Sequence, residues 1–144
     1  MKVVIIGGVA GGATAAARIR RLDEQAEIVV LERSGFISYA NCGLPYYIGG
    51  VIQDQEELTL QTPQGFWDRF RIDVRVRHEA TAIHREEKTV TVKNLETGEV
   101  TTESYDKLIH VSYTHLDVYK RQEQAGLLPG FQAEDAGGGL LAAP

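Results

Sequence analysis

The sequence predicts an α/β fold in which a βαβ unit builds a parallel sheet and a small antiparallel β-meander follows. Residues 2–8, "KVVIIGG", and residues 27–33, "EIVVLER", are continuous apolar runs of the kind found in parallel strands buried on both faces. Between them, residues 11–22, "GGATAAARIRRL", are rich in alanine and other helix formers. A strand, a glycine-rich turn, a helix and a second strand within about 30 residues form a βαβ unit.

The predicted helix has two distinct faces. One carries apolar side chains suited to packing on the sheet, namely Ala15, Ala16, Ile19 and Leu22. The other follows the spacing i, i+4, i+7 and carries polar side chains, namely Thr14, Arg18 and Arg21.

The middle of the chain predicts two short helices and then a change to β-structure. Residues 38–50, "SYANCGLPYYIGG", indicate a loop entering a short helix that stops at Gly49-Gly50, with Pro45 near the helix start. Thr62 is a candidate N-cap, with Pro63 at the first helical position. Residues 71–109 alternate apolar and polar side chains, with a turn at "NLETGE", which predicts a strand followed by an antiparallel meander.

Composition excludes several classes of protein. A chain of 144 residues predicts one domain or a piece of a larger one, and its net charge of −5 gives no indication of nucleic-acid binding. No run approaches the ~20 apolar residues of a membrane span, and "MKVVIIGG" is too short for a signal peptide. A single cysteine argues against a disulfide framework and predicts a cytoplasmic protein.

The first turn, "GGVAGG", predicts a dinucleotide site. Gly7 and Gly12 match the first and third glycines of G-x-G-x-x-G, while Val9 stands at the second. Such a turn aims backbone N–H groups at a pyrophosphate beside the helix N-terminus. Glu32, 20 residues beyond Gly12, stands where an acidic side chain accepts hydrogen bonds from an adenosine ribose, or it is a solvent-facing glutamate at a strand end. The pattern does not separate NAD from FAD.

Cys42, the only cysteine, is either a small buried hydrophobe or a reactive thiol. It is flanked by the polar Asn41, precedes a short helix, and follows the second strand at the carboxyl edge of the sheet, where ligands bind. With no resolving cysteine, an oxidised Cys42 would be a mixed disulfide with a small thiol, a persulfide or a sulfenic acid. His78, His84 and His110 lack metal-ligand spacing, so no metal site is predicted.

Four segments, "VIIGGVAGGATAAARIRRL", "SYANCGLPYYIGG", "QTPQGF" and "YDKLI", resemble the coenzyme A-disulfide reductase group of the pyridine nucleotide-disulfide oxidoreductases, which includes NADH oxidases and persulfide reductases. The resemblance covers residues 1–109. It implies an incomplete Rossmann-like FAD-binding domain, the N-terminal part of a homodimeric enzyme that reduces coenzyme A disulfide or persulfide with NAD(P)H. The parts that the group places further along the chain are a second Rossmann unit, the rest of the FAD domain and a dimerisation domain.

The resemblance also implies roles for individual residues. Cys42 would be the redox-active nucleophile. The implied flavin contacts are Gly7, Gly8, Val9, Ala10, Gly11, Gly12, Glu32 and Arg33, with Ala80 as a backbone contact to adenine. The implied coenzyme A contacts are Thr14, Arg21, Ser38 and Asn41; Arg18 is either a further contact or part of a solvated helix face. Phe70 stands where the group can place a lysine near the pantetheine end, and the neighbouring Arg71 is the candidate to replace it.

Two alternatives to this function stay open. One is an NADH oxidase or peroxidase that cycles Cys42 through a sulfenic acid. The other is a non-catalytic fragment that binds nucleotide weakly or not at all.

The resemblance stops after Ile109. Residues 111–122, "VSYTHLDVYKRQ", can be encoded by DNA that is nearly its own reverse complement and resembles two head-to-head copies of a transposase end sequence. We therefore predict that residues 110–122 are an artefactual junction, in which Tyr113, His115 and Tyr119 have no function; an ordinary polar loop is the alternative. Residues 123–144, with five glycines and five alanines, predict a low-complexity, disordered tail.

Overall fold

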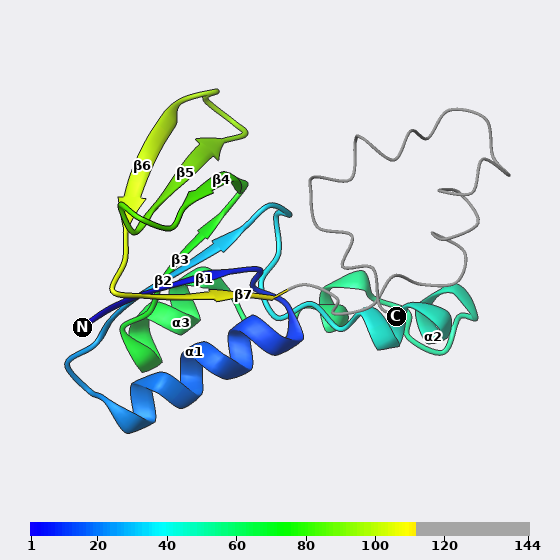
Figure 1. Cartoon of the computed structure of the whole chain (residues 1–144). Coiled ribbons are helices and arrows are strands. Elements are labelled where there is room, and N and C mark those ends of the chain that lie inside the picture. Colours follow the sequence, from blue (N-terminus) through cyan, green and yellow to red (C-terminus); the bar gives the residue numbers. More distant parts are fainter. Residues whose placement is uncertain (112–144) are drawn as a thin grey trace, which may run out of the picture. The chain divides into compact units, whose positions relative to one another are not determined.

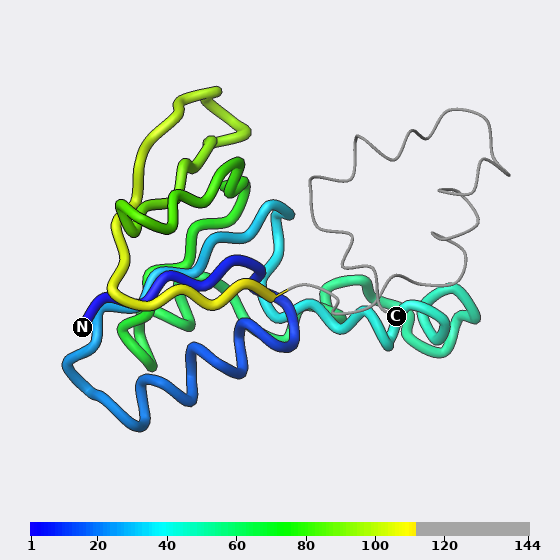
Figure 2. The backbone as a smooth tube through the Cα atoms, viewed as in Figure 1, coloured from blue at the N-terminus to red at the C-terminus, as the bar shows by residue number. Residues whose placement is uncertain are grey.

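Residues 1–111 are the part of the chain that the structure, a computed structural model, describes (Figures 1 and 2). His110 completes the last strand, and the Val111 N–H donates to Ile6 O at 2.9 Å. The first two residues of the predicted junction thus continue the fold. The rest of that junction, residues 112–122, and the predicted tail, residues 123–144, lie outside the described residues.

Four parallel strands form the central sheet. They are β1 (Lys2–Ile6), β2 (Glu27–Glu32), β3 (Asp73–Val76) and β7 (Lys107–His110), in the order β3-β2-β1-β7. Val4 of β1 pairs with Val29 of β2 and with Leu108 of β7. The predicted parallel sheet and its βαβ unit are confirmed.

The sheet buries both of its faces (Figure 1). On one face, Val3 and Ile5 pack with Ala16 of helix α1 (Ala10–Leu22) and Phe66 of helix α3 (Pro63–Phe70). On the other face, Val4, Val29 and Leu31 pack with Val90 and Val92. Burial on both faces explains why these strands are continuous apolar runs instead of alternating ones.

The second layer on the sheet is the predicted antiparallel meander. It consists of β4 (His78–His84), β5 (Thr89–Asn94) and β6 (Val100–Ser104), in that order. The Asn94 Oδ1 closes the β5–β6 turn by accepting from the N–H groups of Glu96 at 2.8 Å and Thr97 at 3.2 Å. Gly98 in this turn has a φ of +77°, a conformation that favours glycine.

Helix α1 presents its predicted apolar face to the sheet with one exception. Ala16 is fully buried, and Ala15 and Ile19 pack against the core. The prediction for Leu22 is wrong, because its side chain is 69% exposed. Leu22 is the last residue of the helix, and Asp23 then turns to an extended conformation, so Leu22 lies beyond the surface that the sheet can cover.

Between β2 and β3 the chain forms several short helical segments. They are the 3₁₀ turns η1 (Asn41–Gly43) and η2 (Gln55–Leu58), the helix α2 (Leu44–Ile48), and α3. As predicted, α2 carries Pro45 in its first turn and ends at Gly49. The predicted N-cap of α3 is also confirmed, because Thr62 Oγ1 accepts from the Gly65 N–H at 3.0 Å.

Candidate functional site

The glycine-rich loop joins β1 to α1 and leaves no room for a side chain at Gly12. Gly7 has a φ of +99°, and its N–H donates to Leu31 O at 2.9 Å. A Cβ on Gly12 would lie 1.7 Å from Gly7 O, so the helix backbone rests directly on the loop. Gly7 therefore makes the tight turn and Gly12 the close approach, as the motif predicts.

The start of α1 is open toward solvent. Val9 occupies the N-cap position and its side chain makes no capping hydrogen bond. Ala10 and Gly11 are exposed. The first N–H groups of a helix lack partners within the helix and favour an anion. The helix start is therefore accessible, even though Val9 stands where the motif has its second glycine.

Glu32 ends β2 beneath the glycine loop. Its side chain is only 8% exposed, so the solvent-facing alternative is wrong. Glu32 Oε2 accepts from the Gly8 N–H at 2.6 Å, and Oε1 accepts from the Ser34 N–H at 2.8 Å. Each carboxylate oxygen can accept more than one hydrogen bond, so Glu32 can hold the loop and still accept from a ribose hydroxyl. The ribose contact stays a prediction.

A cavity of about 180 Å³ lies at this carboxyl end of the sheet. It brings together four residues predicted from the sequence: Gly7, Glu32, Arg33 and Ala80. The sequence patterns did not indicate the other residues that line it, which are Ile6, Leu31, His78, Glu79 and Val111.

Arg33 and Glu79 form an ion pair at this cavity, with Arg33 Nε 3.2 Å from Glu79 Oε1. Glu79 precedes the predicted adenine contact Ala80, and His78 stands two residues before Ala80 on the same strand. Alternation along β4 was the signal that could have indicated His78 as a neighbour of Ala80 on the same face.

The segment that leads to Cys42 is held against the glycine loop. The Ser38 N–H donates to Gly8 O at 3.0 Å, and Ser38 O accepts from the Leu60 N–H at 3.3 Å. Ser38 adopts a φ of +53°, which is rare for residues other than glycine. These bonds place Ser38 beside the predicted phosphate-binding turn.

Cys42 itself lies in η1 and is exposed, so it is not the small buried hydrophobe of the alternative interpretation. The next residue, Gly43, is buried beneath Leu58, and a Cβ there would lie 2.5 Å from Leu58 Cδ2. The glycine after the cysteine therefore lets the turn pack closely while the thiol faces outward. Asn41 precedes Cys42 in the same turn and is also exposed.

A groove of about 300 Å³ runs between α1 and α3. Three predicted coenzyme A contacts line it, namely Thr14, Arg21 and Ser38; Arg18 and Asn41 do not. The remaining lining residues are Ala13, Ala17, Gln61, Phe66, Arg69 and Phe70.

The structure places Arg71, the candidate replacement for a lysine at position 70, outside this groove. Arg71 is not among the lining residues: it caps α3 in the left-handed conformation, and its guanidinium lies over Trp67, 5.6 Å from the ring centroid. Arg69 lines the groove instead. Its spacing of i+3 from the buried Phe66 was the signal for a shared helix face.

Within residues 1–111, no group of three His, Cys, Asp or Glu side chains is arranged to hold a metal ion. None of the helices in the same range is both long enough and apolar enough to cross a membrane.

Comparison with known proteins gives one family. The sequence model described as "Pyridine nucleotide-disulphide oxidoreductase" matches residues 1–111. Coenzyme A disulfide reductase of Staphylococcus aureus (strain JH9) is 50% identical over 108 residues, which cover 75% of this chain and 25% of that protein. The chain thus spans about a quarter of the length of the curated relatives that it matches.

Solved structures agree with this match. Reduced Bacillus anthracis CoADR-RHD has a TM-score of 0.74 at 54% identity, covering 76% of this chain and 20% of that one. The NAD-dependent persulfide reductase from A. fulgidus has a TM-score of 0.73 at 40% identity, with coverage of 76% and 20%. The water-forming NADH oxidase from Lactobacillus brevis, bound to NADH, has a TM-score of 0.74 at 36% identity, with coverage of 82% and 26%.

Proposed function

The chain belongs to the pyridine nucleotide-disulphide oxidoreductase family, and on this premise we propose that it is the N-terminal part of an enzyme that reduces coenzyme A disulfide or a related persulfide. The proposal rests on one observation above all. Exposed Cys42 follows a segment, pinned at Ser38, that joins the glycine loop to the groove lined by Thr14 and Arg21. The same segment thus connects a dinucleotide site, a thiol and a substrate groove.

Membership of this family implies FAD as the cofactor and NAD(P)H as the electron donor of the parent enzyme. The residues fit the group, because the close approach of Gly12 to Gly7 leaves a slim loop under an open helix start. The residues that would hold its adenosine and pyrophosphate are Gly7, Gly8, Val9, Ala10, Gly11, Gly12, Glu32, Arg33 and Ala80. When bound, FAD supplies the passage of electrons from NAD(P)H toward the disulfide.

Cys42 carries the thiol chemistry in this proposal. Its thiolate attacks one sulfur of the substrate disulfide, a new S–S bond forms to Cys42 Sγ, and the other thiol leaves with a proton from solvent. Since Cys42 is the only cysteine, the product is a mixed disulfide between the protein and coenzyme A. Thr14, Arg21, Ser38 and Asn41 would hold the coenzyme A portion, while Arg18, outside the groove, would act only at its rim.

This step can be tested with the chain itself. After incubation with coenzyme A disulfide, intact-protein mass spectrometry is expected to show the addition of one coenzyme A, with release of one equivalent of free coenzyme A. Cys42→Ser is expected to show neither, because it lacks the attacking thiol. If wild-type protein forms no adduct while iodoacetamide alkylates Cys42 fully, the proposed substrate is wrong.

A second candidate function is an NADH oxidase or peroxidase, favoured by the 36% identity to the water-forming NADH oxidase. In that case Cys42 would be oxidised by a peroxide to a sulfenic acid, with reduction of the peroxide to water. Trapping with dimedone after treatment with hydrogen peroxide separates the two candidates. Fast trapping without coenzyme A adduct formation would favour the oxidase.

We also infer that the 144 residues alone do not turn over NADH, since they span about a quarter of the length of their relatives. The parent enzyme would act as a homodimer on a small thiol substrate, in the cytoplasm, where reducing conditions keep Cys42 free. Purified chain is expected to show no NADH-driven reduction of coenzyme A disulfide. Stoichiometric bound flavin together with turnover would contradict this inference.

A further inference from the structure

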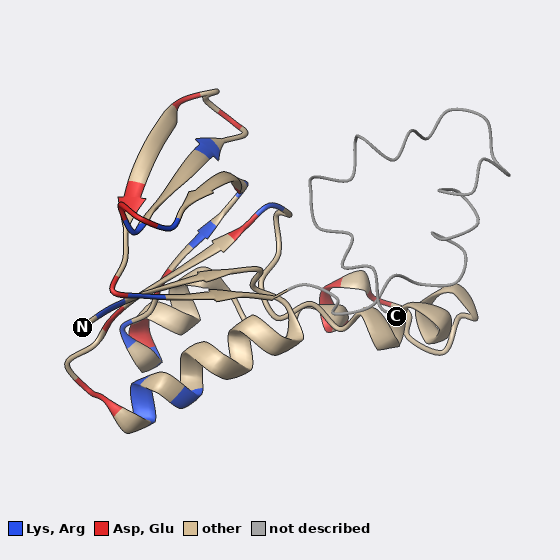
Figure 3. Ribbon diagram, in the orientation of Figure 1, with Lys and Arg blue, Asp and Glu red and all other residues tan. Residues whose placement is uncertain are grey.

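The groove between α1 and α3 is electrostatically unlike the rest of the chain. The whole sequence has a net charge of −5, yet the residues that line this groove include two arginines and no acidic side chain. Figure 3 shows basic positions on both helices. Two cations on facing walls with no anion between them favour a ligand that brings negative charge.

The two arginines lack acidic partners among residues 1–111. Neither Arg21 nor Arg69 takes part in an ion pair there, in contrast to Arg33 and Arg75. Asp68, next to Arg69 in sequence, accepts a hydrogen bond from Gln64 Nε2 at 2.8 Å and does not line the groove. Both guanidinium groups therefore keep their donors available for a ligand.

The walls of the groove are held in place by Arg20. Its Nε donates to Phe70 O at 2.7 Å and its Nη2 donates to Arg71 O at 2.9 Å, at the end of α3. Its Nη1 donates to Glu24 O at 2.6 Å, just beyond the end of α1. Arg20 thereby fixes the two helix ends to each other, and with them the separation of the walls that carry Arg21 and Arg69.

The groove also contains an apolar surface. Phe66 is buried at its base and Phe70 is half-buried beside it. The Arg69 guanidinium lies over the Phe70 ring, 5.1 Å from the centroid, a stacking geometry that restrains it. A ligand that combines phosphate groups with an uncharged portion matches this combination of walls and base.

We propose that Arg69, together with Arg21, selects thiol substrates that carry a phosphate, and that it is a specificity-determining residue of the groove. This inference rests on the proposed function, because it concerns the same substrate. Arg69 contributes charge-assisted hydrogen bonds to a phosphate on the wall opposite Arg21. Substrates of the same thiol chemistry that lack a phosphate would not react faster because of Arg69.

The test compares two disulfides that differ in charge. Coenzyme A disulfide carries phosphates, whereas pantethine has the same reacting arm without the nucleotide. The rate of mixed-disulfide formation at Cys42 is followed by intact mass for wild type, Arg21→Ala, Arg69→Ala, Arg69→Lys and Arg71→Ala. Arg71→Ala is the matched control, because it removes an arginine two residues away that does not line the groove.

Arg69→Ala is expected to slow reaction with coenzyme A disulfide by about tenfold, the worth of one charge-assisted hydrogen bond. Its rate with pantethine is expected to match wild type, which a general loss of structure could not produce. Arg69→Lys should recover part of the rate, because the charge remains without the two-pronged geometry. Arg71→Ala should behave as wild type with both disulfides.

Three outcomes would overturn the inference. If Arg69→Ala slows both disulfides equally, its role is structural. If wild type prefers coenzyme A disulfide and Arg21→Ala loses that preference while Arg69→Ala keeps it, the proposed function stands and only the role of Arg69 fails. If wild type does not distinguish the two disulfides, both the role of Arg69 and the proposed coenzyme A function are wrong.

Discussion

At Gly12 the backbone of α1 approaches Gly7 so closely that hydrogen is the only side chain that fits. The ideal Cβ position lies 1.7 Å from Gly7 O and 2.9 Å from the Gly7 carbonyl carbon. Both atoms belong to the backbone, so a side chain could be accommodated only by moving the loop itself. Gly11, one residue earlier, differs: its Cβ would meet Val111 Cγ1 at 3.1 Å, the end of a side chain.

Gly12→Ala is therefore expected to lower the free energy of unfolding by about 2 kcal/mol or more, the cost of overpacking a close contact. The higher helix propensity of alanine, worth about 1 kcal/mol, offsets only part of this cost. Gly11→Ala is the matched control and is expected to change stability little. Urea unfolding followed by circular dichroism measures both. Equal stabilities for the two variants would contradict the close approach.

Residues of one type differ in role by their position on an element. Arg20 donates to the backbone carbonyls of Phe70 and Arg71, Arg71 caps α3, and Arg69 lines the groove. Charge alone does not separate these arginines in the sequence. Helical spacing relative to the buried Phe66 does separate Arg69 from Arg71.

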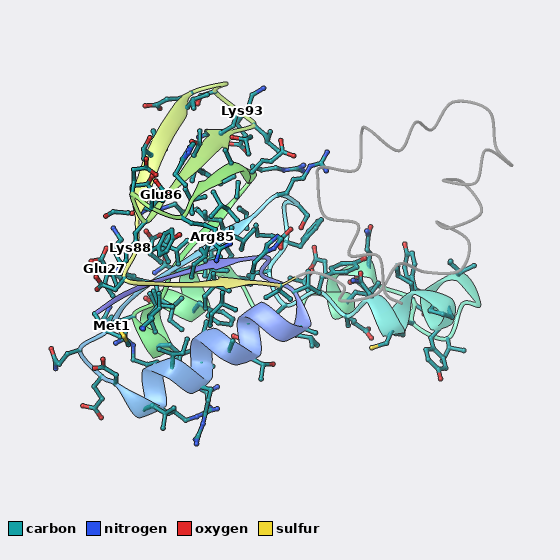
Figure 4. All side chains as sticks on the ribbon, in the orientation of Figure 1. Met1, Glu27, Arg85, Glu86, Lys88 and Lys93 are labelled. Atoms are coloured by element: carbon teal, nitrogen blue, oxygen red, sulfur yellow. The ribbon has the colours of Figure 1, made fainter. Side chains whose placement is uncertain are left out.

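At the scale of elements, a charge network joins the meander to the parallel sheet. Glu103 of β6 lies 2.5 Å from Lys2 Nζ of β1 and 2.5 Å from Arg75 Nη1 of β3. Lys2 Nζ also reaches Glu27 of β2 at 3.0 Å, near the chain start (Figure 4). The Glu103 side chain is 13% exposed, so it is the least solvated member of this network.

The network predicts how stability depends on pH. Partial burial by itself raises the pKa of Glu103, but the hydrogen bonds from Lys2 and Arg75 outweigh it and hold that pKa below its ordinary value. A carboxyl group whose pKa is lowered by folding stabilises the protein above its unfolded pKa. This stabilisation is lost as the pH falls through the folded pKa. The hydrogen bond that Lys2 Nζ donates to the Glu103 carboxylate outweighs desolvation and raises the pKa of Lys2.

Glu103→Gln is expected to lower the free energy of unfolding by about 2 kcal/mol at pH 7, between the values for exposed and buried ion pairs. The difference from wild type should begin to shrink below the ordinary glutamate pKa and disappear as the pH falls through the lowered pKa of folded Glu103, because Glu103 itself then becomes neutral. Glu86→Gln, in an exposed turn of the meander (Figure 4), is the control and should not change the pH profile. Urea unfolding from pH 7 down to about pH 2 checks both, and a difference that does not shrink over this range would contradict the role of the network.

At the scale of the whole molecule, apolar side chains gather around α2. Tyr46 is 59% exposed, Ile48 is 82% exposed and Val51 is 74% exposed. Single exposed apolar residues are ordinary, but several in one short stretch indicate an interaction surface. The stretch follows Cys42 directly, and the chain spans about a quarter of the length of its relatives.

We expect the chain to self-associate through this exposed apolar surface, and the double substitution Ile48→Ser and Val51→Ser to reduce that association. Because both side chains are mostly exposed, the free energy of unfolding should change by less than about 0.5 kcal/mol. Sedimentation velocity and urea unfolding measure these two quantities. Leu58→Ser, at a buried position, is the contrasting control and should destabilise the fold. Loss of stability in the double variant would show that the two side chains pack within the domain.

The sequence by itself determined the fold and the order of its elements. Continuous apolar runs predicted the doubly covered strands, alternation predicted the meander, and Thr62-Pro63 predicted the start of α3, because these are local patterns with a fixed period or a fixed cap. The glycine loop, the segment around Cys42 and the family also followed from short motifs, whereas the exposure of Cys42 came from the structure. The described fold continues through His110 and Val111, two residues beyond the last motif.

Only the tertiary structure decided which side chains meet. It buried Glu32 beneath Gly8, left Leu22 exposed, and placed Arg69 in the groove in place of Arg71. It also joined Lys2, Arg75 and Glu103, which come from three strands far apart in the chain. The reason is physical: a local pattern records the period of one element, whereas a groove or an ion pair depends on how two elements pack against each other.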